Sequence, residues 1–239
     1  MQIPLLDQDH PRFPDPSGAL TEPDGLLAVG GNLQPQTLLS AYRSGIFPWY
    51  QDEDPILWWS PATRCVLPPS DLHCSKSLRK TLRRNDYQVT VNQAFNTVID
   101  ACSEPREDDG GTWITDEMKA AYTQLHQQNK AHSLEVWFED NLVGGLYGVA
   151  VGSIFCGESM FSRRASASKI AMAHLCRWGL DTGVQLIDCQ LVNPHLVSLG
   201  AISMDRSVFI EQLSQGRDKH LNWPLPGTDQ DSTKLQFNW

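Results

Sequence analysis

The sequence predicts an α+β protein in which a small N-terminal domain precedes a larger domain built on a central, mostly antiparallel sheet. Beyond residue 130 the apolar pattern has a period of two through three consecutive strands, and a helix, a further strand and more helices follow. Residues 1–62 differ in composition, because they are dense in proline and glycine and hold eight acidic residues against two arginines. We therefore predict a small domain over residues 1–62 and a second domain over residues 63–239.

Composition indicates an ordinary globular chain. The 239 residues are 41% hydrophobic and 20% charged, with a formal net charge of −9. No run of 18 apolar residues occurs, and the first residues lack the basic and apolar regions of a secretory signal, so we expect a cytoplasmic protein without a membrane partner. Six cysteines without C-x-x-C spacing predict free thiols and no metal site.

In the first 62 residues, a helix is expected from Pro35 to Ser44, with Gly45 as its C-terminal stop. Two aromatic stretches follow, at residues 46–50 and 58–61. Aromatic residues between prolines form a rigid apolar surface that could pack on a neighbouring domain or stack on bases. We expect packing for most of them.

The next segment contains a concentrated basic block. A helix capped by Ser75 would place five cations on one face, at positions i, i+3, i+4, i+7 and i+8. These cations are Lys76, Arg79, Lys80, Arg83 and Arg84. No acidic residue is interleaved to relieve their repulsion, which favours an anionic partner such as a phosphate backbone over a solvated helix face.

The rest of the chain alternates between segments with the apolar period of a helix and segments with the period of two of a strand. Helices are expected at residues 92–102, from Thr115, at 167–182, at 194–199 and at 206–213. Strands are expected at 133–138, 142–151, 155–162 and 184–190. A polar loop spans residues 103–111, and Ser166 or Ser168 would cap the helix that Gly183 ends.

Two of these strands carry a carboxylate within an apolar run. Glu158 lies in the stretch 155–162 and Asp188 in the stretch 186–190, and burying either charge is costly unless it is paired or used. Gly157 interrupts the first strand and predicts either a bulge or a close approach of the backbone to a ligand there. The pattern indicates a site with an acidic wall beside an apolar pocket. A pairing of Glu158 with Arg163 or Arg164 stays open as a structural alternative.

The order of strands and helices resembles acyltransferases of the acetyltransferase (GNAT) type. In place of the Gly-rich pyrophosphate loop of such enzymes, this chain has Ser-Arg-Arg-Ala-Ser at residues 162–166. Coenzyme A is therefore not expected as the donor, and the aromatic clusters and the basic helix suggest an acyl group carried on RNA. A coenzyme A acetyltransferase and a non-catalytic RNA-binding module remain as alternatives.

Six sequence stretches together resemble the leucyl/phenylalanyl-tRNA–protein transferase family. They are residues 25–31 continuing through 41–42, then 45–50, 58–61, 111–115, 155–162 and 186–190. The resemblance covers residues 13–226 and leaves out the tail 228–239. Two positions depart from the family, since Ser166 stands where members carry Asn and Leu146 where some carry Met.

The resemblance implies an enzyme that moves Leu or Phe, and possibly Met, from aminoacyl-tRNA to proteins with N-terminal Arg or Lys, which marks them for N-degron-dependent degradation. It implies a monomer without metal or coenzyme. Asp188, Gln190 and Glu158 would be catalytic, and whether Asp188 takes a proton or only orients the amine stays open. The implied donor pocket consists of Leu146, Phe155, Met160, Leu175 and Ile187. The implied adenosine and aromatic contacts are Tyr42, Trp49, Trp113 and Ser162.

Overall fold

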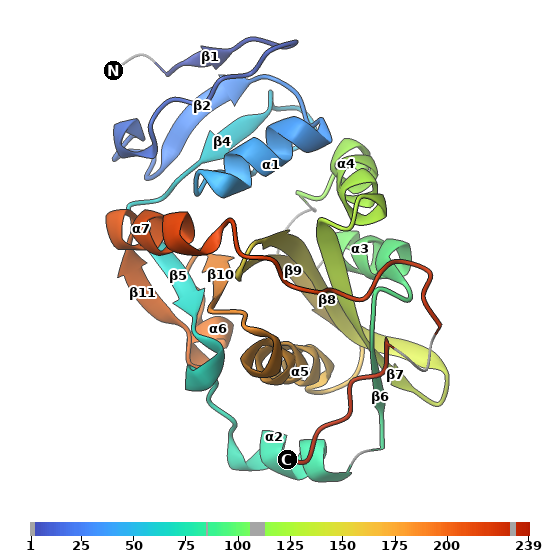
Figure 1. Cartoon of the computed structure of the whole chain (residues 1–239). Coiled ribbons are helices and arrows are strands. Elements are labelled where there is room, and N and C mark those ends of the chain that lie inside the picture. Colours follow the sequence, from blue (N-terminus) through green and yellow to red (C-terminus); the bar gives the residue numbers. More distant parts are fainter. Residues whose placement is uncertain (1–2, 85, 106–112, 230–232) are drawn as a thin grey trace.

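The computed structural model describes residues 3–84, 86–105, 113–229 and 233–239. Within these residues the strands form a four-stranded sheet near the N-terminus and a seven-stranded sheet in the rest of the chain (Figure 1). The α+β prediction, with a small N-terminal part and a mostly antiparallel central sheet, is confirmed. Most of the predicted loop at 103–111 lies outside the described residues.

The small sheet has the strand order β1-β2-β4-β3. Its strands are β1 (Leu5–Leu6), β2 (Leu26–Gly30), β3 (Phe47–Pro48) and β4 (Leu57–Trp59). Helix α1 (Pro35–Arg43) begins with its proline in the first turn and ends before Gly45, whose φ of 76° only glycine adopts readily. The predicted helix is confirmed here.

The large sheet has the order β11-β5-β10-β9-β8-β7-β6. Its strands are β5 (Thr63–Leu67), β6 (Gln88–Val91), β7 (Ala131–Phe138), β8 (Asn141–Val151), β9 (Ile154–Ser162), β10 (Leu186–Gln190) and β11 (Ile202–Asp205). Among these strands, neighbours are antiparallel except for β9 and β10, which run parallel. The sequence patterns predicted β7 to β10 but missed β5, β6 and β11.

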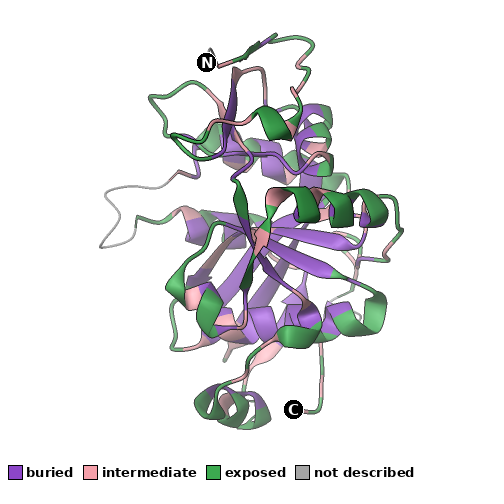
Figure 2. Cartoon of the chain, turned by 90° about the vertical axis from the view of Figure 1, so that its left-hand side faces the viewer, coloured by how far each residue is buried: buried purple, intermediate pink, exposed green. Residues whose placement is uncertain are grey.

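Helices cover both faces of the large sheet. They are α2 (Lys76–Arg84), α3 (Phe95–Ser103), α4 (Asp116–Gln127), α5 (Ala167–Thr182), α6 (Pro194–Ser198) and α7 (Arg206–Gly216). Short 3-10 turns occur at Pro16–Gly18 and Pro69–Asp71. Figure 2 shows the strands buried between these helices.

Side chains alternate between two apolar cores along each strand, as the period of two requires. Phe155 and Ile187 point to the face where α5 packs, while Cys156 and Leu186 point to the face covered by α3 and α4. The core on the α3 and α4 side continues into the small sheet, so both sheets are packed on one hydrophobic cluster. The predicted boundary at residue 62 falls between the strands of the two sheets, and the division into domains stays a prediction.

Two details of the helix predictions are wrong. The helix expected from residue 92 begins at Phe95, because Asn92 adopts a left-handed φ of 61° at the end of β6. Its side chain accepts a hydrogen bond from the Ser133 amide and holds this turn. At the start of α5, Ser166 occupies the N-cap position, also with a left-handed φ, but its side chain makes no capping hydrogen bond.

The contact between β8 and β9 leaves no room for a side chain at Gly148. An added Cβ would lie 2.2 Å from the Cys156 carbonyl oxygen and 2.7 Å from the Phe155 ring. We therefore expect Gly148→Ala to destabilise the protein by about 1–3 kcal/mol through overpacking. Urea unfolding should show this loss, and Gly18→Ala is the control, because nothing lies within 4 Å of its added Cβ. Equal stability of the two variants would contradict the tight packing.

Candidate active site

The site forms where β9 and β10 part. Their parallel pairing ends at Asp188 and Cys156. Directly beyond this point, both strands contain a bulge: Glu158 is the extra residue in β9 and Cys189 the extra residue in β10. The bulge predicted at Gly157 is confirmed. Bulges turn side chains out of the regular alternation, and here they direct both strands away from each other around an opening.

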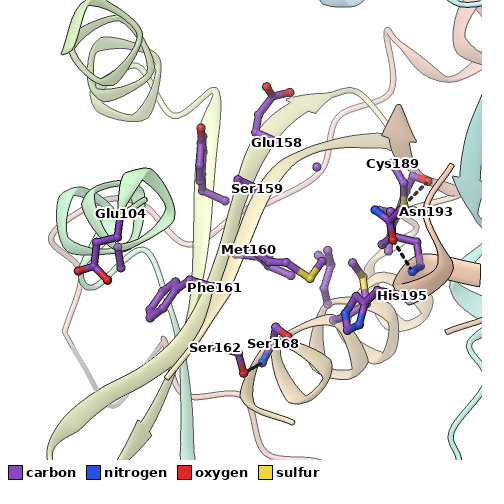
Figure 3. A pocket seen from close by; sticks show the side chains of 18 of the residues that line it. Glu104, Glu158, Ser159, Met160, Phe161, Ser162, Ser168, Cys189, Asn193 and His195 are labelled. Carbon is purple, nitrogen blue, oxygen red and sulfur yellow. Dashed lines mark hydrogen bonds between the residues drawn. The ribbon is translucent and has the colours of Figure 1, made fainter. Parts of the chain in front are cut away.

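A cavity of about 780 Å³ fills this opening. All five predicted donor-pocket residues line it, together with Met172 from α5: Leu146, Phe155, Met160, Leu175 and Ile187. Glu158 lies at one end of the cavity and Ser162 and Ser168 at the other, with Met160 between them (Figure 3). Its size is that of a pocket for a small ligand, and its middle is apolar.

Glu158 is buried and accepts two hydrogen bonds. Its Oε1 accepts from the Gln190 side-chain amide at 2.7 Å, and its Oε2 accepts from the Tyr122 hydroxyl at 2.9 Å. Burial raises the pKa of Glu158 to about 7, although the hydrogen bonds from Tyr122 and Gln190 oppose this rise. The carboxyl group therefore titrates near neutral pH, in a range where it can hold or release a proton.

Asp188 is fully buried in a bidentate ion pair with Arg64 of β5. Arg64 Nε donates to Asp188 Oδ1 at 2.8 Å, and Arg64 Nη2 donates to Oδ2 at 2.7 Å. The guanidinium group lies 4.7 Å from the ring centroids of both Phe47 and Phe209. Arg64 therefore already balances the charge of Asp188 in the folded protein. The catalytic assignment of Asp188 stays a prediction.

Gln190 connects the two carboxylates. Its backbone amide donates to Asp188 Oδ1 at 2.9 Å, and its side chain donates to Glu158. The residue adopts a left-handed φ of 61°, a strained conformation that persists only where surrounding contacts enforce it. The ion pair thus fixes the turn that aims Gln190 at Glu158.

The structural alternative for Glu158 is wrong. Arg163 pairs with Glu104, and Arg164 lies over the Phe138 ring at 3.3 Å from its centroid. Neither arginine contacts Glu158 among the interactions of the described residues. The carboxyl group instead belongs to a hydrogen-bonded network that continues from Tyr122 to the Tyr42 hydroxyl at 2.5 Å.

Of the four predicted adenosine and aromatic contacts, two line the cavity and two do not. Trp113 and Ser162 line the cavity. Tyr42 is only 1% exposed and its hydroxyl bonds to Tyr122, so the structure places it in the buried network around Glu158, and its adenosine contact stays a prediction. Trp49 is 41% exposed and does not line the cavity, although its ring surface is open to a ligand. The other aromatics, such as Phe47 and Trp58, are packed as predicted.

The basic helix α2 has the predicted form. Ser75 caps it through a hydrogen bond from the Leu78 amide, Leu78 and Leu82 are buried, and the five cations together line a second cavity of about 470 Å³. The prediction that none of the cations has an acidic partner is wrong for Arg84, which pairs with Asp86 at 2.6 Å. Within the described residues, the other four form no ion pair with an acidic side chain.

Several site residues were missed from the sequence. Arg64, Tyr122, Tyr147, Met172 and His195 all lie in the network or the cavity wall. A signal was present only for Arg64, because an arginine within the apolar run Cys-Val-Leu implies a buried partner. Tyr122, Tyr147 and Met172 occupy ordinary apolar positions of helices and strands, and His195 is a half-buried residue of the short helix α6, so the pattern gave no reason to assign any of them to a site.

Comparison with known proteins decides the family. Residues 66–214 match the family described as leucyl/phenylalanyl-tRNA protein transferase, and residues 31–62 match the N-terminal domain of the same family. The chain belongs to the leucyl/phenylalanyl-tRNA protein transferase family. It is thus an aminoacyltransferase by family.

Curated relatives extend this match over nearly the whole chain. The protein is 51% identical over 220 residues to a leucyl/phenylalanyl-tRNA–protein transferase of Shewanella baltica, which covers 92% of this chain and 93% of the relative. A transferase of the same name from Psychromonas ingrahamii is 50% identical and covers 93% of each chain.

Among solved structures, the chain is similar to FemX, with a TM-score of 0.48 and 10% identity over 71% of this chain and 66% of that one. It is also similar to a GCN5-related N-acetyltransferase from Kribbella flavida, with a TM-score of 0.39 and 11% identity over 67% and 57% of the two chains. In the described part of the chain, no helix is long and apolar enough to cross a membrane. No group of three or more possible metal ligands occurs among those residues.

Arg64→Met leaves the Asp188 carboxylate buried without its partner. We expect a loss of about 3–5 kcal/mol in the free energy of unfolding, because an uncompensated buried charge is costly. Combining it with Asp188→Leu removes both charges and should recover most of the stability. Activity should stay low in the double variant, because Gln190 loses the Oδ1 acceptor that holds its turn. Urea unfolding and a transfer assay measure the two effects, and full activity of the double variant would contradict this role.

The raised pKa of Glu158 makes its contribution to stability depend on pH. Between its ordinary value of 4.5 and about 7, the folded state keeps the proton while the unfolded state loses it, so stability falls as pH rises through this window. Relative to Glu158→Gln, wild type should lose up to about 3 kcal/mol between pH 4.5 and 8. Urea unfolding of both proteins at matched pH values tests this, and parallel stability curves would count against a raised pKa.

Proposed function

We propose that this protein transfers Leu or Phe from aminoacyl-tRNA to the α-amino group of proteins with N-terminal Arg or Lys, and so marks them for N-degron-dependent degradation. The observation that carries the proposal is the cavity between β9 and β10, whose apolar middle leads to the Glu158 network. Family membership supports the reaction type, and the acceptor choice rests on the acidic end of the cavity.

The apolar part of the cavity suits a Leu or Phe side chain. Phe155 and Ile187 are buried strand residues, and Met160 and Met172 add flexible thioethers that adapt to either shape. Met as a donor fits the same surface. A pocket rarely separates side chains that differ by one methylene by more than about 200-fold, so a choice among these donors is a matter of degree.

Glu158 is the group we assign to the acceptor's basic residue. It lines the cavity and is 9% exposed, whereas Asp188 is sealed by Arg64. An ionised Glu158 would attract the positive charge of an N-terminal Arg or Lys, and the arrival of that charge would lower the carboxyl pKa. The role of Asp188 is therefore to position Gln190 through its backbone, and Gln190 orients the acceptor beside Glu158.

The chemistry requires little more than positioning. An aminoacyl ester is already activated, and an α-amine with a pKa of about 7.7–8.0 is partly neutral at pH 7. Holding the amine against the ester supplies the main acceleration. Proton abstraction by Asp188 is disfavoured, since its two oxygens already accept hydrogen bonds from Arg64 and Gln190.

The tRNA would approach along α2 and α5. Helix α5 contacts α2, and it lines the donor cavity through Met172 and Leu175. Cations on α2 would hold phosphates, while the exposed Trp49 and the cavity-lining Trp113 offer faces for the terminal bases. We further propose that the protein works in the cytoplasm as a monomer, without metal or coenzyme.

A transfer assay tests the proposed function. The protein is incubated with Phe-tRNA carrying labelled Phe and a peptide that begins with Arg, and the label should appear at the peptide N-terminus. The matched control is the same peptide with an acetylated N-terminus, which keeps the side chain but removes the nucleophile. A peptide that begins with Ala tests the acceptor choice. If no peptide receives the label, the proposed transfer reaction is refuted. If the Arg and Ala peptides receive equal label, the proposed acceptor choice is refuted.

Binding through phosphates makes tRNA affinity depend on salt. Lys76→Ala together with Lys80→Ala removes two cations that form no ion pair with another described residue. If each neutralises one phosphate, the log–log slope of affinity against salt should flatten by about 0.9 per contact. Fluorescence anisotropy with labelled tRNA at several salt concentrations measures this slope.

The control for the basic helix is Lys119→Ala on α4, where the lysine pairs with Asp116 at 2.7 Å. In Figure 1, α2 lies at the bottom of the molecule, whereas α4 lies in the upper half, beside α3. This variant loses a positive charge without touching α2, so its slope should equal that of wild type. If the double α2 variant also keeps the wild-type slope, α2 is a solvated face and does not bind tRNA.

A further inference from the structure

Tyr147 is a cavity residue with an unused polar group. It lies on β8 opposite Ser159, is fully buried, and lines the cavity together with Glu158 and Trp113. In the described part of the chain, its hydroxyl has no hydrogen-bond partner. A buried donor without a partner destabilises the fold, so its presence calls for an explanation. A bound ligand that accepts its hydrogen bond is such an explanation.

The neighbouring tyrosines differ in this respect. Tyr122 donates to Glu158 and bonds to Tyr42, which together complete the hydroxyl contacts of that network. Tyr147 packs edge-on against Tyr122 and Phe95, at centroid distances of 5.6 and 5.8 Å, so its ring is fixed by aromatic contacts. The ring accounts for the packing, whereas the hydroxyl contributes nothing to it.

The hydroxyl stays protonated at any working pH. Burial, followed by the nearby Glu158 charge, raises the pKa of Tyr147 well above its ordinary value of 10. It is therefore a fixed neutral donor on a residue that lines the cavity together with Glu158. Acyl transfer from an ester places negative charge on the carbonyl oxygen. A hydrogen-bond donor already positioned for that oxygen stabilises the charge in the transition state and so accelerates the reaction.

We propose that Tyr147 donates a hydrogen bond to the carbonyl oxygen of the donor ester as charge develops on it. This assignment rests on the proposed function. The amine nitrogen forms the new bond to the carbonyl carbon, and the π electrons move to the oxygen that Tyr147 holds. When the carbonyl re-forms, the bond to the ribose oxygen breaks, and the proton released by the amine ends on that oxygen. Tyr147 keeps its own proton throughout.

Tyr147→Phe is the test, because it removes the hydroxyl and keeps the ring that packs on Tyr122 and Phe95. We expect kcat for Phe transfer to fall about 100-fold or more, as for the loss of an oxyanion donor, with KM for the aminoacyl donor little changed. Binding of an unreactive donor analogue, phenylalanine joined to the adenosine ribose by an amide, should also be unchanged. A purely structural hydroxyl would not produce this division between kcat and binding.

Thermal unfolding gives an independent readout. Removing an unsatisfied buried donor should leave Tm unchanged or raise it by about 2–4 °C, so the slower enzyme would be at least as stable. An unchanged kcat, a loss confined to KM, or a fall in Tm in parallel with activity would each overturn the assignment.

The reaction with hydroxylamine separates this inference from the acceptor choice. Hydroxylamine replaces the peptide as nucleophile but attacks the same carbonyl carbon, so the enzyme-dependent rate should show the same drop in Tyr147→Phe. If wild type fails with Arg peptides yet aminolysis by hydroxylamine is slowed in the variant, the proposed acceptor is wrong and the role of Tyr147 holds. An equal enzyme-dependent rate in both proteins would refute that role.

Discussion

The ion pair between Arg64 and Asp188 is the interaction on which the site depends. It joins β5 to β10, and Arg64 also donates to the Gly45 carbonyl at 3.1 Å and lies between the rings of Phe47 and Phe209. Both charges are almost completely excluded from water, so their hydrogen bonds must offset a large desolvation cost. One side chain thereby connects the small sheet, the large sheet and α7.

A chain of hydrogen bonds leads from this pair to Glu158. Asp188 fixes the backbone turn of Gln190, whose side chain reaches Glu158, and Glu158 is held on its other side by Tyr122. Each contact uses one more polar atom of a buried network, and such networks are rigid when every member is satisfied. Among the described residues that line the cavity, the hydroxyl of Tyr147 and Nε2 of His195 are buried without a hydrogen-bond partner.

The sequence predicted the parts of this arrangement that have a local cause. Periodicity located β7 to β10 and α5, Gly157 indicated the bulge at Glu158, and Ser75 indicated the start of α2. The resemblance to the family supplied five residues as a predicted donor pocket, and the fold places these residues around one cavity. The sequence could not identify Arg64 as the partner of Asp188, because the two residues are 124 positions apart. The strand β5 that carries Arg64 is also too short for a period of two to be recognised.

The position of Arg64 also constrains how a substrate can enter. Since the guanidinium group donates to the Gly45 carbonyl and lies against the ring of Phe47, swinging the small sheet away would break these two contacts and expose the buried ion pair of Arg64 and Asp188 to water. A hinge between the two sheets is therefore an expensive way to admit a bulky nucleic acid. Entry costs less free energy when both sheets stay in place and the end of the substrate inserts into the cavity between β9 and β10.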